Sequence, residues 1–218
     1  MIYDIVVIGL GGIQSFALQA LAKQLGGKGK RILGIGQYQC VHTKGLSHGE
    51  SQIYQRSYFE NEGYIFWIDF SIHEFEKLEQ ESNASILGKC SNLILQDKQP
   101  DNNEQDNSTT KEKNYLQLAM DAVKWHNIEV ELLEQGALKK YFSKFCYTYN
   151  DAEMIGLLEL GSGFVCPKQA MAAALHKAQI SDGVTFYGNT RVEWLKEVQT
   201  CSSGEALSNS RPLIARLY

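Results

Sequence analysis

Two short stretches hold the residues whose types and spacing could do chemistry. Gly9 and Gly11 directly follow the apolar run of residues 5–8, and residues 42–51 have the sequence His-Thr-Lys-Gly-Leu-Ser-His-Gly-Glu-Ser. In the first stretch, Gly9 permits a tight turn, and Gly11 lets the main chain approach a pyrophosphate at the N-terminus of the next helix. The second stretch has two histidines, three hydroxyl side chains and no periodicity. A loop of this kind is usually functional or disordered.

The elements around the glycine turn predict a nucleotide-binding βαβ unit. Residues 5–8 are mostly β-branched, which predicts a strand buried on both faces of a parallel sheet. Apolar residues then recur at helical spacing up to Leu25, and residues 30–35 predict a second strand. Gln14 stands at the third glycine of the dinucleotide pattern, and Gly36 with Gln37 stands where an acid normally binds the ribose. Taken alone, the turn fits an ordinary βα connection as well as a nucleotide site.

The rest of the chain predicts an α/β protein with a polar insertion. Residues 97–114 contain no apolar residue except Pro100 and cannot offset the entropy of ordering, so we expect a mobile surface segment. Trp67, Trp125 and Trp194 are expected in the core or at contacts between domains. Periodicity and turn residues predict helices at 61–82, 115–126, 134–142 and 167–179, and strands at 90–95, 154–160, 184–187 and 190–198, with a further strand beginning after residue 211.

Composition limits the classes of partner. The chain has 218 residues, a formal net charge of −4 and no apolar run near the roughly 20 residues that cross a bilayer. We therefore expect neither nucleic acid nor a membrane as the main partner. The N-terminus leads directly into a strand, without the regions of a secretory signal. The five cysteines and five histidines show no ligand spacing, which predicts reduced thiols in an intracellular protein and no metal site.

With both stretches in view, the sequence resembles the FAD-dependent amine oxidases, in particular the monomeric and peroxisomal sarcosine oxidases and the L-pipecolate oxidases. The motif Ser47-His48-Gly49 beside a dinucleotide fold is the most specific part of the match. The resemblance covers nearly the whole chain except the insertion and the last residues, and family members continue well past its end. The segments that carry it occur in the family's order: 4–11, 30–33, 42–51, 153–158, 162–165 and 190–192.

The resemblance implies a Rossmann-like FAD-binding domain with part of an antiparallel-sheet substrate domain, apparently truncated. It divides the chain into a βαβ unit with the active-site loop at 1–90, a partial substrate domain at 91–150, and a return to the FAD domain at 151–218. The residues that it implies are His48 on the substrate side of the flavin, Gly9, Leu10, Gly11, Gly12 and Ile13 at the pyrophosphate, Gly36 and Gln37 near the ribose, Ser47 and Gly49 beside the isoalloxazine, and Val192 at the adenine.

The implied activity is oxidation of a secondary amine, such as sarcosine or pipecolate, by hydride transfer to flavin N5, after which dioxygen reoxidises the flavin and gives hydrogen peroxide. Gln52 and Gln55 replace two family arginines that would stabilise the reduced flavin or the substrate carboxylate. A second interpretation is therefore an inactive paralogue that binds FAD weakly or not at all. A third, a nicotinamide-binding module, is disfavoured by Gly36.

The remaining expectations concern partners and location. The resemblance implies a monomer whose partners are an amino-acid-like amine and dioxygen. It also implies a peroxisomal location, but the chain carries no C-terminal targeting signal, so a cytoplasmic location is the alternative.

Overall fold

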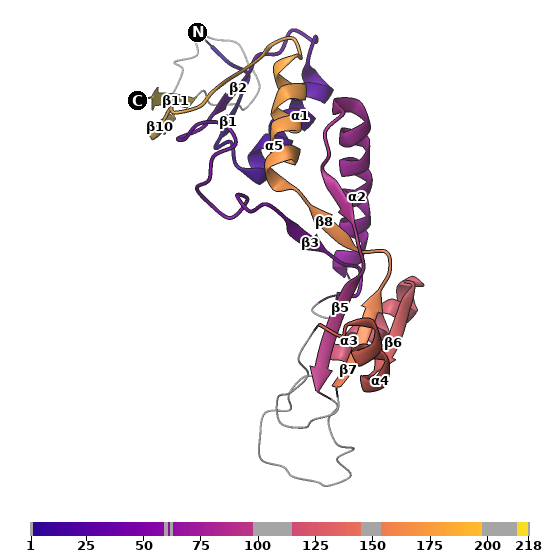
Figure 1. Cartoon of the computed structure of the whole chain (residues 1–218). Coiled ribbons are helices and arrows are strands. Elements are labelled where there is room, and N and C mark those ends of the chain that lie inside the picture. The colour runs from indigo at the N-terminus through magenta and orange to yellow at the C-terminus, as the bar shows by residue number, and fades with distance from the viewer. Residues whose placement is uncertain are drawn as a thin grey trace. The chain divides into compact units, whose positions relative to one another are not determined.

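The structure is a computed structural model that describes residues 2–58, 61, 63–97, 115–144, 154–197 and 213–217. The chain forms two compact units (Figure 1). The first is drawn from residues 1–50, 78–84 and 166–218, and the second from residues 51–77 and 85–165. None of the helices in the described ranges is both long and apolar enough to cross a bilayer.

The first unit is built on a parallel sheet in which β2 (Ile32–Ile35) lies between β1 (Ile5–Ile8) and β9 (Val184–Tyr187). Helices α1 (Gly12–Leu25) and α5 (Pro167–Gln179) pack against each other and against this sheet. A β-carbon at Gly34 would lie only 2.9 Å from Leu18 and Phe186, so glycine in β2 is what allows the close approach. The predicted βαβ unit is thereby confirmed. Its core consists of Leu10, Leu18, Ala22, Ile32, Leu175 and Ala178.

Strand β1 differs from the prediction of a strand buried on both faces. Ile5 and Val7 pack against the core, but Val6 and Ile8 remain 44% and 43% exposed. In the part of the chain that the structure describes, β1 is an edge strand of this sheet. The prediction was wrong because a β-branched run specifies a strand but not the number of layers that cover it.

Two further features complete the first unit. β10 (Val192–Glu197) and β11 (Leu213–Leu217) pair as an antiparallel two-stranded sheet. Ahead of β1, the Asp4 carboxylate accepts a hydrogen bond from the main-chain N–H of Arg31 at 2.8 Å and another from Lys30 Nζ at 2.9 Å. The hydrogen bond from Arg31, followed by the one from Lys30, holds the pKa of Asp4 below its ordinary value.

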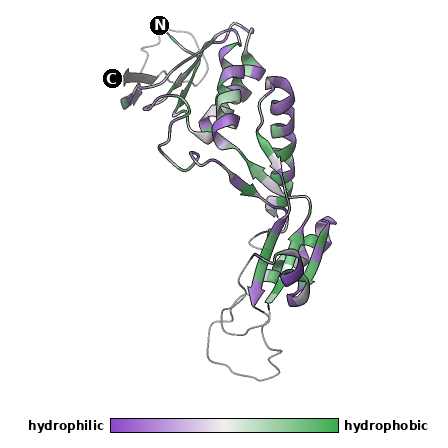
Figure 2. Cartoon of the chain, viewed as in Figure 1, coloured by the Kyte–Doolittle hydropathy of each residue, from purple (hydrophilic) through white to green (hydrophobic). Residues whose placement is uncertain are grey.

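The second unit contains two antiparallel sheets. In one, β8 (Gly163–Val165) lies between β3 (Gln52–Tyr54) and β4 (Leu87–Lys89); in the other, β7 (Met154–Glu159) lies between β5 (Asn92–Asp97) and β6 (Val130–Glu134). α3 (Tyr115–His126) packs on the second sheet through Leu116, Ala119 and Val123 around Leu157. Figure 2 shows hydrophobic residues concentrated along β5, β6 and β7. The remaining helices are α4 (Gln135–Tyr141) and α2 (Gly63–Ser82), which begins in the second unit and ends in the first.

The predicted helices are confirmed to within two residues at each end. The short strands β3, β4, β6 and β8 were not predicted, because runs of three to five residues carry too little periodicity. Asp97, predicted as the start of the insertion, is the last residue of β5, and residues 98–114 lie outside the described ranges. The tryptophans do not lie in the core, one of the two places predicted for them: Trp67, Trp125 and Trp194 are 61%, 80% and 43% exposed.

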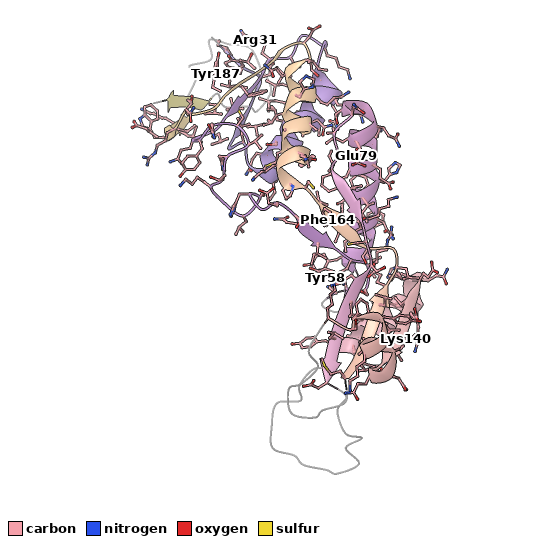
Figure 3. All side chains as sticks on the ribbon, in the orientation of Figure 1. Arg31, Tyr58, Glu79, Lys140, Phe164 and Tyr187 are labelled. Carbon is pink, nitrogen blue, oxygen red and sulfur yellow. The ribbon has the colours of Figure 1, made fainter. Side chains whose placement is uncertain are left out.

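A buried carboxylate joins the end of β7 to the segment that follows β3. Glu159 is fully buried and accepts hydrogen bonds from the main-chain N–H groups of Arg56 and Ser57, both at 2.9 Å, and from Ser57 Oγ at 2.6 Å. The Arg56 side chain in turn pairs with Asp69 of α2 and donates to the carbonyl of Gly161. These contacts fix the main chain just before Tyr58, which Figure 3 labels.

Candidate functional site

The N-terminus of α1 opens onto a cavity of about 250 Å³ within the first unit. Two segments far apart in the sequence make most of its wall, namely the glycine turn and residues 42–47. The structure therefore brings together the two stretches that the sequence singled out. The lining residues are Leu10, Gly11, Gly12, Ile13, Gln14, His42, Lys44, Gly45, Leu46, Ser47 and Met171.

The glycine turn has the main-chain geometry that a close approach requires. Gly9 has φ +99°, a left-handed conformation that side chains disfavour, and its N–H donates to the carbonyl of Ile35 at 2.7 Å. Gly11 is the N-cap of α1 and supplies no side-chain hydrogen bond, and the first turn contains no acid. The first N–H groups of the helix thus face the cavity region without a side-chain cap from Gly11, and they carry partial positive charge. Ser15 supports the turn from within the core, where its buried Oγ donates to the carbonyl of Leu10 at 3.2 Å.

The loop of residues 42–51 rests against this helix end through Ser47. A β-carbon at Gly12 would lie 2.6 Å from Ser47 Oγ, so the contact is available only to glycine. Within the loop, His42 Nδ1 accepts a hydrogen bond from the main-chain N–H of Lys44 at 3.0 Å, so this histidine stabilises the main chain of its own loop. The loop ends at Glu50, whose carboxylate pairs with Lys168 of α5 at 2.5 Å; this hydrogen bond lowers the pKa of Glu50.

The charges around the cavity favour an anion. Lys44 is in the wall, the N-terminus of α1 points at the cavity, and no Asp or Glu is among the lining residues. Leu10 and Met171 are almost fully buried and give the wall an apolar part. Phosphate groups attached to a less polar body match this combination.

Among the residues that line the cavity, Gln14 departs from the glycine pattern of dinucleotide-binding turns, which has a third glycine at this position. Its Cδ and Cγ lie 3.3 and 3.4 Å from the position that a β-carbon would take on Gly9, and its Oε1 lies 3.5 Å from the same position on Gly11. The Gln14 side chain therefore lies over the turn.

The other residues implied by the resemblance lie outside the cavity wall. His48 is exposed, and its Nδ1 contacts the carbonyl of Gly45 in its own loop; Gly49 follows it. Gly36 continues the sheet, since its N–H donates to Tyr187 O at 2.8 Å, and Gln37 is exposed. Val192 is the first residue of β10. The structure thus groups Leu10, Gly11, Gly12, Ile13 and Ser47 at one cavity, with Gly9 in the adjoining turn.

The two glutamines that replace family arginines belong to the second unit. Gln52 is in β3, opposite Val165 of β8. Gln55 follows β3, and its Oε1 accepts a hydrogen bond from Asn92 at 2.5 Å. The Gln55 carboxamide is therefore already used within the second unit.

Sequence reasoning missed two features. Lys44 was not assigned to a site, although it is the basic residue of a loop otherwise rich in small polar residues. The second unit has a cavity of about 210 Å³, in whose wall Tyr58 and Tyr64 meet edge to face at 5.3 Å. Burial raises the pKa of Tyr54 in the same wall. Within the described ranges, no cluster of three or more His, Cys, Asp or Glu side chains could hold a metal ion.

Comparison with curated proteins gives sarcosine oxidases and N-methyl-L-tryptophan oxidases as relatives over most of the chain. The monomeric sarcosine oxidase of Streptomyces avermitilis is 27% identical over 196 residues, which are 88% of this chain and 45% of that protein. The peroxisomal sarcosine oxidase of Mus musculus is 26% identical over 174 residues, which are 80% of this chain and 39% of that protein. The chain thus spans less than half the length of these relatives. No protein-family model matches it.

Solved structures share the fold. NikD, an unusual amino acid oxidase essential for nikkomycin biosynthesis, matches with a TM-score of 0.70 at 16% identity, over 90% of this chain and 45% of that one. L-α-glycerophosphate oxidase from Mycoplasma pneumoniae, solved with FAD bound, matches with a TM-score of 0.62 at 15% identity, over 89% of this chain and 47% of that one. The predicted fold class is confirmed by these matches. The chain is a homologue of the monomeric and peroxisomal sarcosine oxidases and corresponds to the N-terminal part of their sequence.

Proposed function

We propose that this chain is the FAD-binding part of an oxidase that acts on secondary amines of amino-acid type, such as N-methyl or cyclic amino acids. The observation that carries the proposal is the cavity at the N-terminus of α1, which combines an uncapped helix end, Lys44 and no carboxylate. The names of the relatives support the class of reaction, and the FAD bound to one structural neighbour supports the cofactor. Sarcosine and pipecolate are the substrates to test first.

The residues of the cavity have distinct tasks in this proposal. The N–H groups at the start of α1 and the ammonium of Lys44 bind the negative charge of the pyrophosphate. Gly11 and Gly12 keep the main chain accessible, and Ser47 adds a hydroxyl beside Gly12. Leu10 and Met171 exclude water from one side. FAD, when bound, supplies the hydride acceptor for amine oxidation.

His48 is proposed as the residue of this loop on the substrate side. Its Nδ1 contacts the carbonyl of Gly45, and a carbonyl oxygen can only accept a hydrogen bond. The proton of the neutral imidazole is therefore held at Nδ1, and Nε2 is left as the acceptor. In this state Nε2 can take a hydrogen bond from the ammonium or the N–H of an amine substrate.

An inactive paralogue is the second candidate, and one observation favours it. Gln52 and Gln55 cannot supply the positive charge that a substrate carboxylate or a reduced flavin would require. Because Gln55 is already bonded to Asn92, it is also not free to turn toward a ligand. In this case the chain would retain the fold and lose the reaction.

The test of FAD binding uses Gly11. A β-carbon there would meet only Gln14 Oε1, at the ordinary contact distance of 3.5 Å, and Gly11 is an N-cap, where Asp and Asn are both favourable. Gly11→Asp and Gly11→Asn should therefore both fold as well as the parent chain. We expect FAD to raise the melting temperature of the parent most, that of Gly11→Asn less, because its side chain covers the main chain that the pyrophosphate approaches, and that of Gly11→Asp not at all, because its carboxylate also repels the pyrophosphate. For scale, a ligand at 100 times its Kd adds about 2.7 kcal/mol to stability.

Equal binding by all three proteins, or binding by none, would overturn the proposed cofactor site. The reaction is tested separately, by mixing the FAD-loaded chain anaerobically with sarcosine or pipecolate and following the visible absorbance of the flavin. Loss of that absorbance supports the oxidase. An unchanged spectrum with bound FAD overturns an oxidase activity carried by this chain alone, which is the result that the inactive paralogue predicts.

A further inference from the structure

We propose that Gln14 sets the dinucleotide affinity of this chain by occupying the glycine turn itself, so that the turn accepts the cofactor's phosphates only after the Gln14 side chain rotates away. This inference rests on the proposed FAD site and adds a residue that opposes binding there. It concerns a position at which the chain departs from the dinucleotide pattern, because Gln14 stands where that pattern has its third glycine.

The geometry places the Gln14 carboxamide on the surface that a pyrophosphate needs. Its Cδ, Cγ and Nε2 lie 3.3, 3.4 and 3.6 Å from the β-carbon position of Gly9, and its Oε1 lies 3.5 Å from that of Gly11. A group no larger than a methyl on either glycine would thus already touch the carboxamide. A phosphate that approached the same main chain would meet it as well, and would also meet the partial negative charge of Oε1.

The same geometry shows that the obstruction can be removed. The Gln14 carboxamide has no hydrogen bond to any residue that the structure describes, and the residue is only half-buried. Van der Waals contacts between the side chain and the turn are individually weak. Rotation of the side chain therefore breaks no strong interaction. The free energy that it requires is subtracted from cofactor binding.

The direction in which truncation of Gln14 changes the affinity for FAD distinguishes obstruction by this side chain from a favourable contact with the phosphates. If the carboxamide Nε2 donated a hydrogen bond to a phosphate, truncation of Gln14 would weaken binding. If the carboxamide obstructs the turn, truncation strengthens binding. Confining one rotamer-rich side chain to the conformations that leave the turn open corresponds to about a two- to tenfold change in Kd.

The experiment compares the parent chain with Gln14→Ala and with Gln24→Ala, a control on an exposed position of the same helix. Alanine favours the helix in both variants, so each should fold, and urea denaturation checks that it does. Titration calorimetry measures the Kd for FAD and for ADP, which has the two phosphates but no flavin. We expect Gln14→Ala to bind both ligands about two- to tenfold more tightly than the parent, and Gln24→Ala to bind them as the parent does.

Each outcome decides the inference. Unchanged or weaker binding by Gln14→Ala overturns it, and so does tighter binding of FAD without tighter binding of ADP, because the obstruction is at the phosphates. If the parent binds FAD and Gln14→Ala binds it equally, only the inference fails. If Gln14→Ala binds and the parent does not, the inference stands and the proposed cofactor function of the natural chain fails. If neither binds, both fail.

Discussion

Glu159 offers the sharpest test of how the second unit is held together. Its buried carboxylate accepts hydrogen bonds from Arg56 N, Ser57 N and Ser57 Oγ at 2.9, 2.9 and 2.6 Å. In Glu159→Leu the main-chain N–H groups of Arg56 and Ser57 lose their side-chain acceptor. In Glu159→Gln the shape of the side chain is kept. However, an NH₂ group, which can only donate, replaces one carboxylate oxygen and faces another hydrogen-bond donor.

The magnitudes follow from the number of donors left without an acceptor. One buried donor without a partner costs about 1–3 kcal/mol, so Glu159→Leu should lower the free energy of unfolding by roughly 2–6 kcal/mol and Glu159→Gln by about 1–3 kcal/mol. Whole domains are stable by only about 5–15 kcal/mol, so the leucine variant approaches the limit of folding. Glu131, an exposed residue of β6, provides matched controls: Glu131→Leu and Glu131→Gln should change stability by no more than about 0.5 kcal/mol.

The assay is urea denaturation followed by tryptophan fluorescence, since Trp67 and Trp125 both belong to the second unit. The expected order of destabilisation is Glu159→Leu, then Glu159→Gln, then the two Glu131 controls, with unchanged dependence of the free energy on urea. A Glu159→Leu variant as stable as its Glu131 counterpart would refute the reasoning. Hydrogen exchange at the amides of Arg56 and Ser57, which should accelerate in both Glu159 variants, keeps the test decisive if the leucine variant is partly unfolded.

Three further predictions concern the first unit. Gly183→Ala should lower the melting temperature more than Gly27→Ala. Both glycines have positive φ, but a β-carbon at Gly183 would lie 2.2 Å from the carbonyl oxygen of Lys30, whereas one at Gly27 would meet no atom within 4 Å. Equal decreases in melting temperature would contradict this prediction. Gly12→Ala should lower the free energy of unfolding, and adding Ser47→Gly should restore much of that loss, because it removes the side chain that the new methyl group meets. A double-mutant cycle measures this coupling. If the effects of the two substitutions on stability simply add, the contact between loop and helix is contradicted. Because the pKa of Asp4 is lowered in the folded chain, its stabilisation is complete above the unfolded value of 3.8 and disappears as the pH falls through the folded pKa. The difference in urea midpoint between the parent and Asp4→Asn should therefore shrink in acid, and a pH-independent difference would contradict the assignment.

The site was predictable where the signals are local. A strand followed by Gly9 and Gly11 and then by helical periodicity predicts the βα turn, and the structure has a left-handed Gly9 at that point. The loop of residues 42–51 was singled out by its polar residues and lack of periodicity. The sequence did not predict that Lys44 lines the same cavity as Gly11, because their proximity depends on how the loop folds back.

The misses share a cause. Val6, Ile8 and Trp67 were expected inside from their residue types, and all three are substantially exposed. Residue type determines how much a side chain gains from burial, but only the neighbouring layers determine whether burial occurs. Glu159 is the converse case, an acid whose burial no sequence pattern predicts and that three donors hold inside the second unit.

By itself, the sequence determined the local elements of this protein, because caps, turns and periodicity act over a few residues. Pro167 and the apolar spacing after it predict a helix at 167–179, and α5 has these bounds. The tertiary structure alone decided that Ser47 rests on Gly12 and that the Gln14 side chain covers the turn. Such contacts join segments or side-chain conformations that no local pattern specifies. The glycine motif therefore predicts where a dinucleotide could bind, and the packing around the motif determines the affinity.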